Sequence, residues 1–120
     1  EAFRPEVGCM TERDLLTGYE AYLLTPMSLL DAKRVAVGIE DTHPLGRLFD
    51  IDIIDPEGCP VPRERVGEQP RRCLVCNREA RYCMRQHSHT QEEIWARINN
   101  DIQQWKSSVS HHPSPSTAVE

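Results

Sequence analysis

The pattern of apolar and polar positions is most regular near the end of the chain, between residues 90 and 106. Apolar side chains recur there at the spacing of one helical face: Ile94, Ile98, Ile102 and Trp105. Thr90-Gln91-Glu92-Glu93 precedes them and forms a capping box, in which a threonine oxygen and a glutamate carboxylate satisfy exposed backbone N–H groups. This pattern predicts a helix over Thr90–Lys106, with an apolar stripe that covers a sheet.

Strands are predicted where the alternation has a period of two. Val35, Val37 and Ile39 alternate with smaller or polar residues across 33–40, and aromatic and aliphatic residues gather at 19–25. Thr25-Pro26 is typical of a helix start, with a short helix to Ala32. Residues 11–16 favour one helical turn or the end of a helix that begins earlier. Together these elements indicate an α+β fold, with a small mixed or antiparallel sheet and the C-terminal helix packed on it.

A third strand is predicted over residues 45–54, and it carries the candidate chemistry. Phe49, Ile51 and Ile53 would face one side and Asp50 and Asp52 the other. Two neighbouring carboxylates raise the cost of ionising each other, and a divalent cation with oxygen ligands relieves that cost. The pair therefore indicates a magnesium–phosphate site, with a solvated strand face as the alternative.

The flanking residues support that interpretation. Gly46 lets backbone approach a phosphate closely, and the Arg47 guanidinium can grip phosphate oxygens. After the strand, Asp55-Pro56-Glu57-Gly58 matches a type I turn, with Cys59–Val61 as the return limb of a hairpin.

Composition and charge narrow the function classes. The 120 residues indicate one domain, without the ~20-residue apolar run that crosses a membrane and without a signal peptide. We therefore expect a soluble, cytoplasmic chain with no membrane partner. The net charge of -5 argues against nucleic acid, yet residues 63–85 hold seven arginines against three glutamates, which suits a polyphosphate or an acidic protein.

Five cysteines, an odd number, fit a reducing compartment better than a disulfide framework. Cys73, Cys76 and Cys83, with His87 or His89, have the spacing of four tetrahedral zinc ligands. Reduced thiols without metal are the alternative. A redox pair is disfavoured, because the motif does not open a helix in a βαβ unit. Cys9 and Cys59 have no evident partner.

Two stretches together resemble the citrate lyase holo-acyl-carrier-protein synthase family, CitX: residues 43–53, and Arg71-Arg72-Cys73-Leu74-Val75-Cys76 with Cys83 and His89. The resemblance runs from about Thr17 to the helix after His89. Members normally have a further N-terminal segment, so we expect a fragment, with a catalytic domain at 1–106 and a disordered tail at 107–120.

The resemblance implies a nucleotidyltransferase-like fold and transfer of a phosphoribosyl-dephospho-CoA group, from its triphosphate precursor to a serine of the apo acyl carrier subunit, with release of pyrophosphate. The resemblance strengthens the prediction of Mg²⁺ on Asp50 and Asp52. Glu40 is the candidate for a third carboxylate, because the strand predicted at 33–40 ends there, and Asp55 is the second choice. The resemblance also favours His89 over His87 as the zinc ligand.

The remaining site residues are predicted by role. Arg47 acts with the aspartates, and His43 is a candidate base for the serine. Candidate contacts to the precursor are Gly46, Arg47, Lys33, Arg71 and Arg72. A rival hypothesis is a zinc-knuckle binding module that uses the arginine-rich segment to hold an acidic partner.

Overall fold

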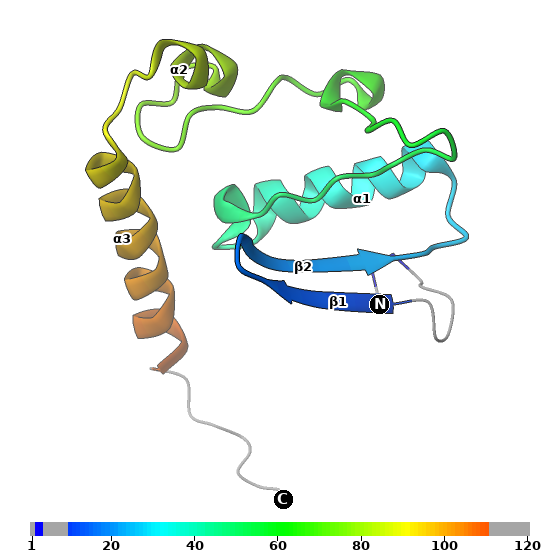
Figure 1. Ribbon diagram of the computed structural model, residues 1–120, viewed down its shortest axis with the longest axis horizontal. Helices are drawn as coiled ribbons and strands as arrows, with labels where there is room; N and C mark the ends of the chain where they lie inside the picture. The colour runs from blue at the N-terminus through cyan, green and yellow to red at the C-terminus, as the bar shows by residue number, and fades with distance from the viewer. Residues whose placement is uncertain (1, 4–9, 111–120) are drawn as a thin grey trace, which may run out of the picture. The chain divides into compact units, whose positions relative to one another are not determined.

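A computed structural model describes residues 2–3 and 10–110, and it confirms the α+β class (Figure 1). The described elements, in chain order, are β1 (Met10–Leu15), β2 (Gly18–Leu23), α1 (Leu29–Thr42), the 3-10 helices η1 (Gly46–Leu48) and η2 (Arg63–Val66), α2 (Ala80–Gln86) and α3 (Gln91–Ser110).

Strands β1 and β2 form an antiparallel hairpin, with pairs running from Met10↔Leu23 to Leu15↔Gly18. The predicted strand at 19–25 is confirmed as β2, but the helical turn at 11–16 is wrong. The polar sequence of β1 has no apolar alternation, and its strand character comes from pairing with β2. The Tyr19 hydroxyl also donates a cross-strand hydrogen bond to the Glu12 carboxylate. Every residue of both strands is exposed.

Helix α1 replaces the strand predicted at residues 33–40. It begins after Ser28, whose Oγ accepts a hydrogen bond from the Asp31 backbone N–H at 3.2 Å. The buried positions follow a helical period rather than an alternation: Ala32, Lys33, Ala36, Val37 and Glu40. The valine alternation was misleading because two of the three buried apolar residues of α1 are small alanines.

The strand predicted at 45–54 is also absent from the described residues. Its beginning is the 3-10 helix η1, and only Ile54 forms a β-bridge, to Pro60. The turn after it is confirmed: the Gly58 N–H donates to the Asp55 carbonyl at 2.9 Å. The return limb is confirmed as well, since the Val61 N–H donates to the Ile53 carbonyl at 2.9 Å.

The chain divides into two compact units, residues 1–38 with 51–68, and residues 39–50 with 69–120. The buried apolar residues of the first unit are Ala32, Ala36, Val37 and Val61. The second unit buries Glu40, Gly46, Cys73 and Cys83. The sheet belongs to the first unit and α3 to the second, so the packing of α3 on the sheet stays a prediction, as does the single catalytic domain. The nucleotidyltransferase-like fold also stays a prediction, since the described sheet contains neither Asp50 nor Asp52.

Helix α3 confirms the prediction at 90–106. The Glu93 backbone N–H donates to Thr90 Oγ1 at 3.1 Å, and the predicted apolar stripe is half-buried. The helix continues to Ser110, four residues farther than predicted, so 107–110 are helical; the rest of the predicted tail lies outside the described residues. No helix in the described ranges has the length and apolarity needed to span a membrane.

Candidate functional site

Gly46 packs directly against the end of α1. The Gly46 N–H donates to the His43 carbonyl at 2.8 Å, which folds residues 43–46 into a tight turn. A Cβ at Gly46 would lie 2.7 Å from the Glu40 carbonyl carbon and 2.9 Å from the Ile39 carbonyl oxygen. Glycine is therefore required here by backbone packing, whatever ligand the loop holds.

Arg47 and Arg71 each bind the backbone around the other. The Arg47 Nη2 donates to the Cys73 carbonyl at 2.7 Å and to the Arg72 carbonyl at 3.4 Å. The Arg71 guanidinium donates to the carbonyls of Phe49 at 2.6 Å, Arg47 at 3.0 Å and Gly46 at 3.4 Å. These five contacts join the predicted phosphate loop to the cysteine segment.

Glu40 is paired with Arg71. Its carboxylate lies 3.6 Å from Arg71 Nη1, and its side chain is only 4% exposed. A buried carboxylate requires such a counter-charge, and the guanidinium provides it. Glu40 as a magnesium ligand stays a prediction, but its observed contact positions Arg71.

The two aspartates are exposed, and neither makes a hydrogen bond or ion pair with a described residue. They belong to different units, Asp50 to the second and Asp52 to the first, so each is described by itself. Free carboxylates of this kind suit a hydrated Mg²⁺, which is bound through one or two carboxylates and substrate phosphates. Asp55 instead caps its own turn, because its Oδ1 accepts from the N–H groups of Glu57 at 3.0 Å and Cys59 at 2.8 Å.

His43 is held by its own turn. The Leu45 N–H donates to His43 Nδ1 at 3.0 Å, and the ring packs against Phe49 with centroids 4.9 Å apart. Because Nδ1 accepts a hydrogen bond, the neutral ring carries its proton on Nε2 and presents a donor. A general base needs a free lone pair, so this tautomer does not favour the predicted base role.

The two other cations predicted to contact the precursor differ in exposure. Lys33 is buried in α1, 6% exposed, whereas the Arg72 side chain is exposed. Lys33 is in the first unit and Arg72 in the second. Their roles stay predictions.

The Cys73–Cys76 segment forms a tight knuckle. Arg72 and Glu79 form an antiparallel bridge at its base, and the Asn77 N–H donates to the Cys73 carbonyl at 3.1 Å. Asn77 takes a left-handed conformation with φ 64°, which asparagine tolerates better than most residues. The chain then enters α2, which carries Cys83.

The backbone conformation distinguishes His87 from His89 as the fourth member of the cysteine cluster. His87 is exposed, with φ 50°, and ends α2 through its N–H bond to the Cys83 carbonyl. This turn brings His89 back toward the knuckle. The ligand atoms of Cys73, Cys76, Cys83 and His89 all lie within 4.8 Å of one another, so the four residues predicted from spacing form one cluster.

The donor set fits a tetrahedral metal. Zinc–sulfur bonds of ~2.3 Å place two ligand sulfurs about 3.8 Å apart, and the Cys76 and Cys83 sulfurs are 3.4 Å apart. His89 Nε2 is buried and makes no hydrogen bond, while Nδ1 lies 3.3 Å from Glu93 Oε2. A carboxylate on the outer nitrogen of a histidine is the usual support for a zinc ligand.

The charge of Arg78 favours the thiolate form of Cys76. The Arg78 Nε donates to Cys76 Sγ at 3.2 Å and lowers the pKa of that thiol to about 5. Burial raises the pKa of Cys83. All four described cysteines carry free thiols, which leaves the cluster sulfurs available to a metal.

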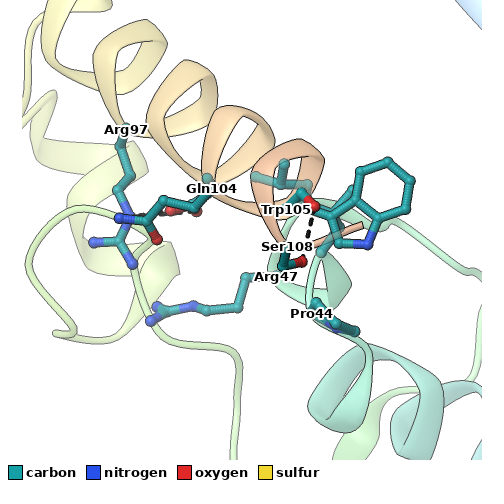
Figure 2. A pocket seen from close by; sticks show the side chains of 9 residues that line it. Pro44, Arg47, Arg97, Gln104, Trp105 and Ser108 are labelled. Atoms are coloured by element: carbon teal, nitrogen blue, oxygen red, sulfur yellow. Dashed lines mark hydrogen bonds and ion pairs between the residues drawn. The ribbon is translucent and has the colours of Figure 1, made fainter. Parts of the chain in front are cut away.

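A pocket lies beside Arg47 in the second unit, between the turn after α1 and the last turns of α3 (Figure 2). Its volume is about 250 Å³. Its lining residues are Pro44, Leu45, Arg47, Leu48, Arg97, Asp101, Gln104, Trp105 and Ser108.

Comparison with known proteins identifies the family. A family model described as apo-citrate lyase phosphoribosyl-dephospho-CoA transferase, CitX, matches residues 4–105. The chain belongs to the CitX family.

Comparison with individual proteins supports the same family assignment. An Escherichia coli O1:K1 protein named apo-citrate lyase phosphoribosyl-dephospho-CoA transferase is 36% identical over 89 residues, which are 72% of this chain and 49% of that protein. A Streptococcus pyogenes serotype M18 protein, "Probable apo-citrate lyase phosphoribosyl-dephospho-CoA transferase", is 36% identical over 86 residues, 69% of this chain and 45% of its own length. The Haemophilus influenzae "Protein CitXG" is 36% identical over 88 residues, 73% of this chain and 19% of its own. The chain therefore spans about half the length of the first two.

The sequence analysis did not predict two ion pairs near the Gly46–Phe49 loop of this CitX chain. Arg97 and Asp101 are four residues apart on α3, the spacing at which side chains of a helix meet, and that signal was available. The pairing of Arg71 with Glu40 joins residues 31 positions apart, and no local pattern reveals it.

Proposed function

We propose that this chain is the transferase part of an enzyme that attaches a phosphoribosyl-dephospho-CoA group to the apo acyl carrier subunit of citrate lyase. The serine hydroxyl of the carrier attacks the triphosphate precursor, the new phosphoester bond forms, and pyrophosphate leaves with the electron pair of the broken P–O bond. The hydroxyl proton passes to solvent or to a base. Membership of the CitX family is the observation that carries this proposal.

The described loop supports phosphoryl chemistry, which depends on positioning and charge stabilisation more than on covalent help. Arg47 is fixed by two backbone carbonyls, and Arg71 holds the loop that carries it. Asp50 and Asp52 would hold Mg²⁺, which supplies charge neutralisation to a triphosphate when bound. Their exposed, unpartnered carboxylates are consistent with that role.

Zinc would have a structural role in this enzyme. Four protein ligands leave no open position for a substrate, so Cys73, Cys76, Cys83 and His89 would close the site. The cluster would then fix the segment whose carbonyls hold Arg47.

The test is a reaction of this chain with the triphosphate precursor, Mg²⁺ and apo carrier, followed by the intact mass of the carrier. We expect a mass gain that is lost when the acceptor serine of the carrier is replaced by alanine. Pyrophosphate released at the same rate without carrier would indicate a phosphohydrolase and would overturn the proposal.

A further inference from the structure

The pocket beside Arg47 combines cationic and aromatic side chains. Two guanidinium groups, those of Arg47 and Arg97, line it together with the indole of Trp105. Figure 2 shows the two guanidinium groups toward one end of the pocket, and the Trp105 indole and Pro44 toward the other. An anionic group and a flat aromatic group on one ligand would match these two ends.

Both arginines are anchored through one part of the guanidinium and keep other donors. Arg47 uses Nη2 for the Cys73 and Arg72 carbonyls. Arg97 uses Nε for both Asp101 oxygens, at 3.0 and 3.3 Å. Within the described residues, Nη1 and Nε of Arg47 and both Nη atoms of Arg97 have no acceptor. Anchored guanidinium groups with free N–H donors are well suited to phosphate oxygens.

Charge and size limit the ligand. The pocket holds two arginines and one aspartate, so it carries one net positive charge and favours an anion. Its volume of about 250 Å³ is smaller than the ~300–1,000 Å³ of sites that enclose whole drug-sized ligands. It would take a nucleoside monophosphate portion of a larger molecule.

We propose that this pocket binds the phosphorylated adenosine portion of the precursor. The purine stacks on the Trp105 indole, and a phosphate lies between Arg47 and Arg97. Gln104 provides an amide on the Arg97 side of the pocket (Figure 2), where it can hydrogen-bond the ribose or the phosphate. This inference rests on the proposed function for the identity of the ligand, but the binding itself is measurable without transfer.

The chain has two tryptophans, which allow a direct optical test with adenosine 5′-monophosphate as probe. Trp105 lines the pocket, whereas Trp95 is 53% exposed and does not. In the Trp95→Phe variant, only Trp105 fluoresces, and its intensity is expected to fall to a plateau as the probe is added. In the Trp105→Phe variant, where only Trp95 fluoresces, the intensity is expected to stay constant.

Calorimetry with the same probe tests the arginine. Arg97→Ala should raise the Kd about tenfold or more, and Arg97→Lys should recover part of the loss. Arg85→Ala is the matched control, because Arg85 is exposed on α2 and does not line the pocket. Far-UV circular dichroism verifies that each variant is folded.

The outcomes separate this inference from the proposed function. Quenching in Trp95→Phe alone, with weaker binding in Arg97→Ala, supports a nucleotide pocket even if the chain transfers nothing to the carrier. If the chain modifies the carrier but the probe causes no Trp105 response, and Arg97→Ala leaves the KM for the precursor unchanged, the inference is wrong and the proposed function stands. Equal binding to all variants also overturns it.

Discussion

Arg71 lies with its Nη1 3.6 Å from the buried carboxylate of Glu40, and the same guanidinium reaches three carbonyls of the Gly46–Phe49 loop. One side chain thus neutralises a buried charge and satisfies the backbone of the loop that carries Arg47. The geometry of the predicted phosphate loop depends on this arginine.

Replacing Arg71 with alanine should lower the free energy of unfolding by about 2 to 3 kcal/mol. The buried Glu40 carboxylate loses its contact with the guanidinium, and the carbonyls of the Gly46–Phe49 loop lose their side-chain donor. Chemical denaturation measures it. In a double-mutant cycle, Glu40→Gln should recover part of the loss in the Arg71→Ala background. Strictly additive effects would show that the two residues do not interact.

Gly46→Ala should destabilise the chain by about 1 to 3 kcal/mol, because the new methyl group overlaps the backbone at the end of α1. Gly38→Ala is the matched control. Gly38 lies inside α1, and a methyl group added there would have no neighbouring atom within 4 Å, so alanine should be neutral or stabilise by up to about 1 kcal/mol. Thermal unfolding of the two variants should give Tm shifts of opposite sign or of clearly unequal size. Equal Tm shifts would contradict the observed packing.

The Cys/His cluster predicts one zinc per chain. Elemental analysis of the purified chain should find it, and Cys76→Ser should lose it, whereas Cys59→Ser should retain it because Cys59 is exposed and outside the cluster. Removal of zinc by a chelator should lower Tm by similar amounts in the unsubstituted chain and in Cys59→Ser, and not at all in Cys76→Ser. Full zinc occupancy in Cys76→Ser would exclude this ligand set.

Glu93→Gln tests the support of His89. The Glu93 carboxylate contacts Nδ1, and losing its charge should weaken zinc binding by about 10-fold without changing the stoichiometry. Glu92→Gln is the control, because Glu92 lies in the same turn of α3 and is not part of the cluster. Competition with a chromophoric chelator measures both affinities, and identical values would assign Glu93 no role.

The helix α3 and the cysteine cluster were predictable because their signals are local. A capping box and a four-residue apolar period specify α3, and ligand spacing specifies the cluster. The segment at 45–54 was mispredicted for the opposite reason. Its Phe-Ile-Ile alternation is typical of a strand, but the carbonyls of Gly46, Arg47 and Phe49 are satisfied by Arg71, more than 20 positions later.

Helix α1 illustrates a second limit. The Val35-Val37-Ile39 alternation suggests a strand, yet burial follows Ala32, Ala36 and Val37. Alanines add little to an apolar pattern, although they are the best helix formers and pack closely. Strand β1 is specified by its partner, and its own sequence does not predict it.

Asp50→Asn and Asp52→Asn should each abolish transfer while changing the free energy of unfolding by no more than about 0.5 kcal/mol, because both side chains are exposed and unpartnered. Glu57→Gln, in the exposed turn that follows, is the matched control and should transfer normally. Full activity in both aspartate variants would remove them from the reaction.

The most direct test of the proposed transfer is the intact mass of the apo acyl carrier subunit after incubation with this chain, the triphosphate precursor and Mg²⁺. We predict a gain of one phosphoribosyl-dephospho-CoA group per carrier, with one pyrophosphate released for each carrier modified. An unchanged carrier mass, in a reaction where the full-length Escherichia coli relative modifies the same carrier, would contradict it.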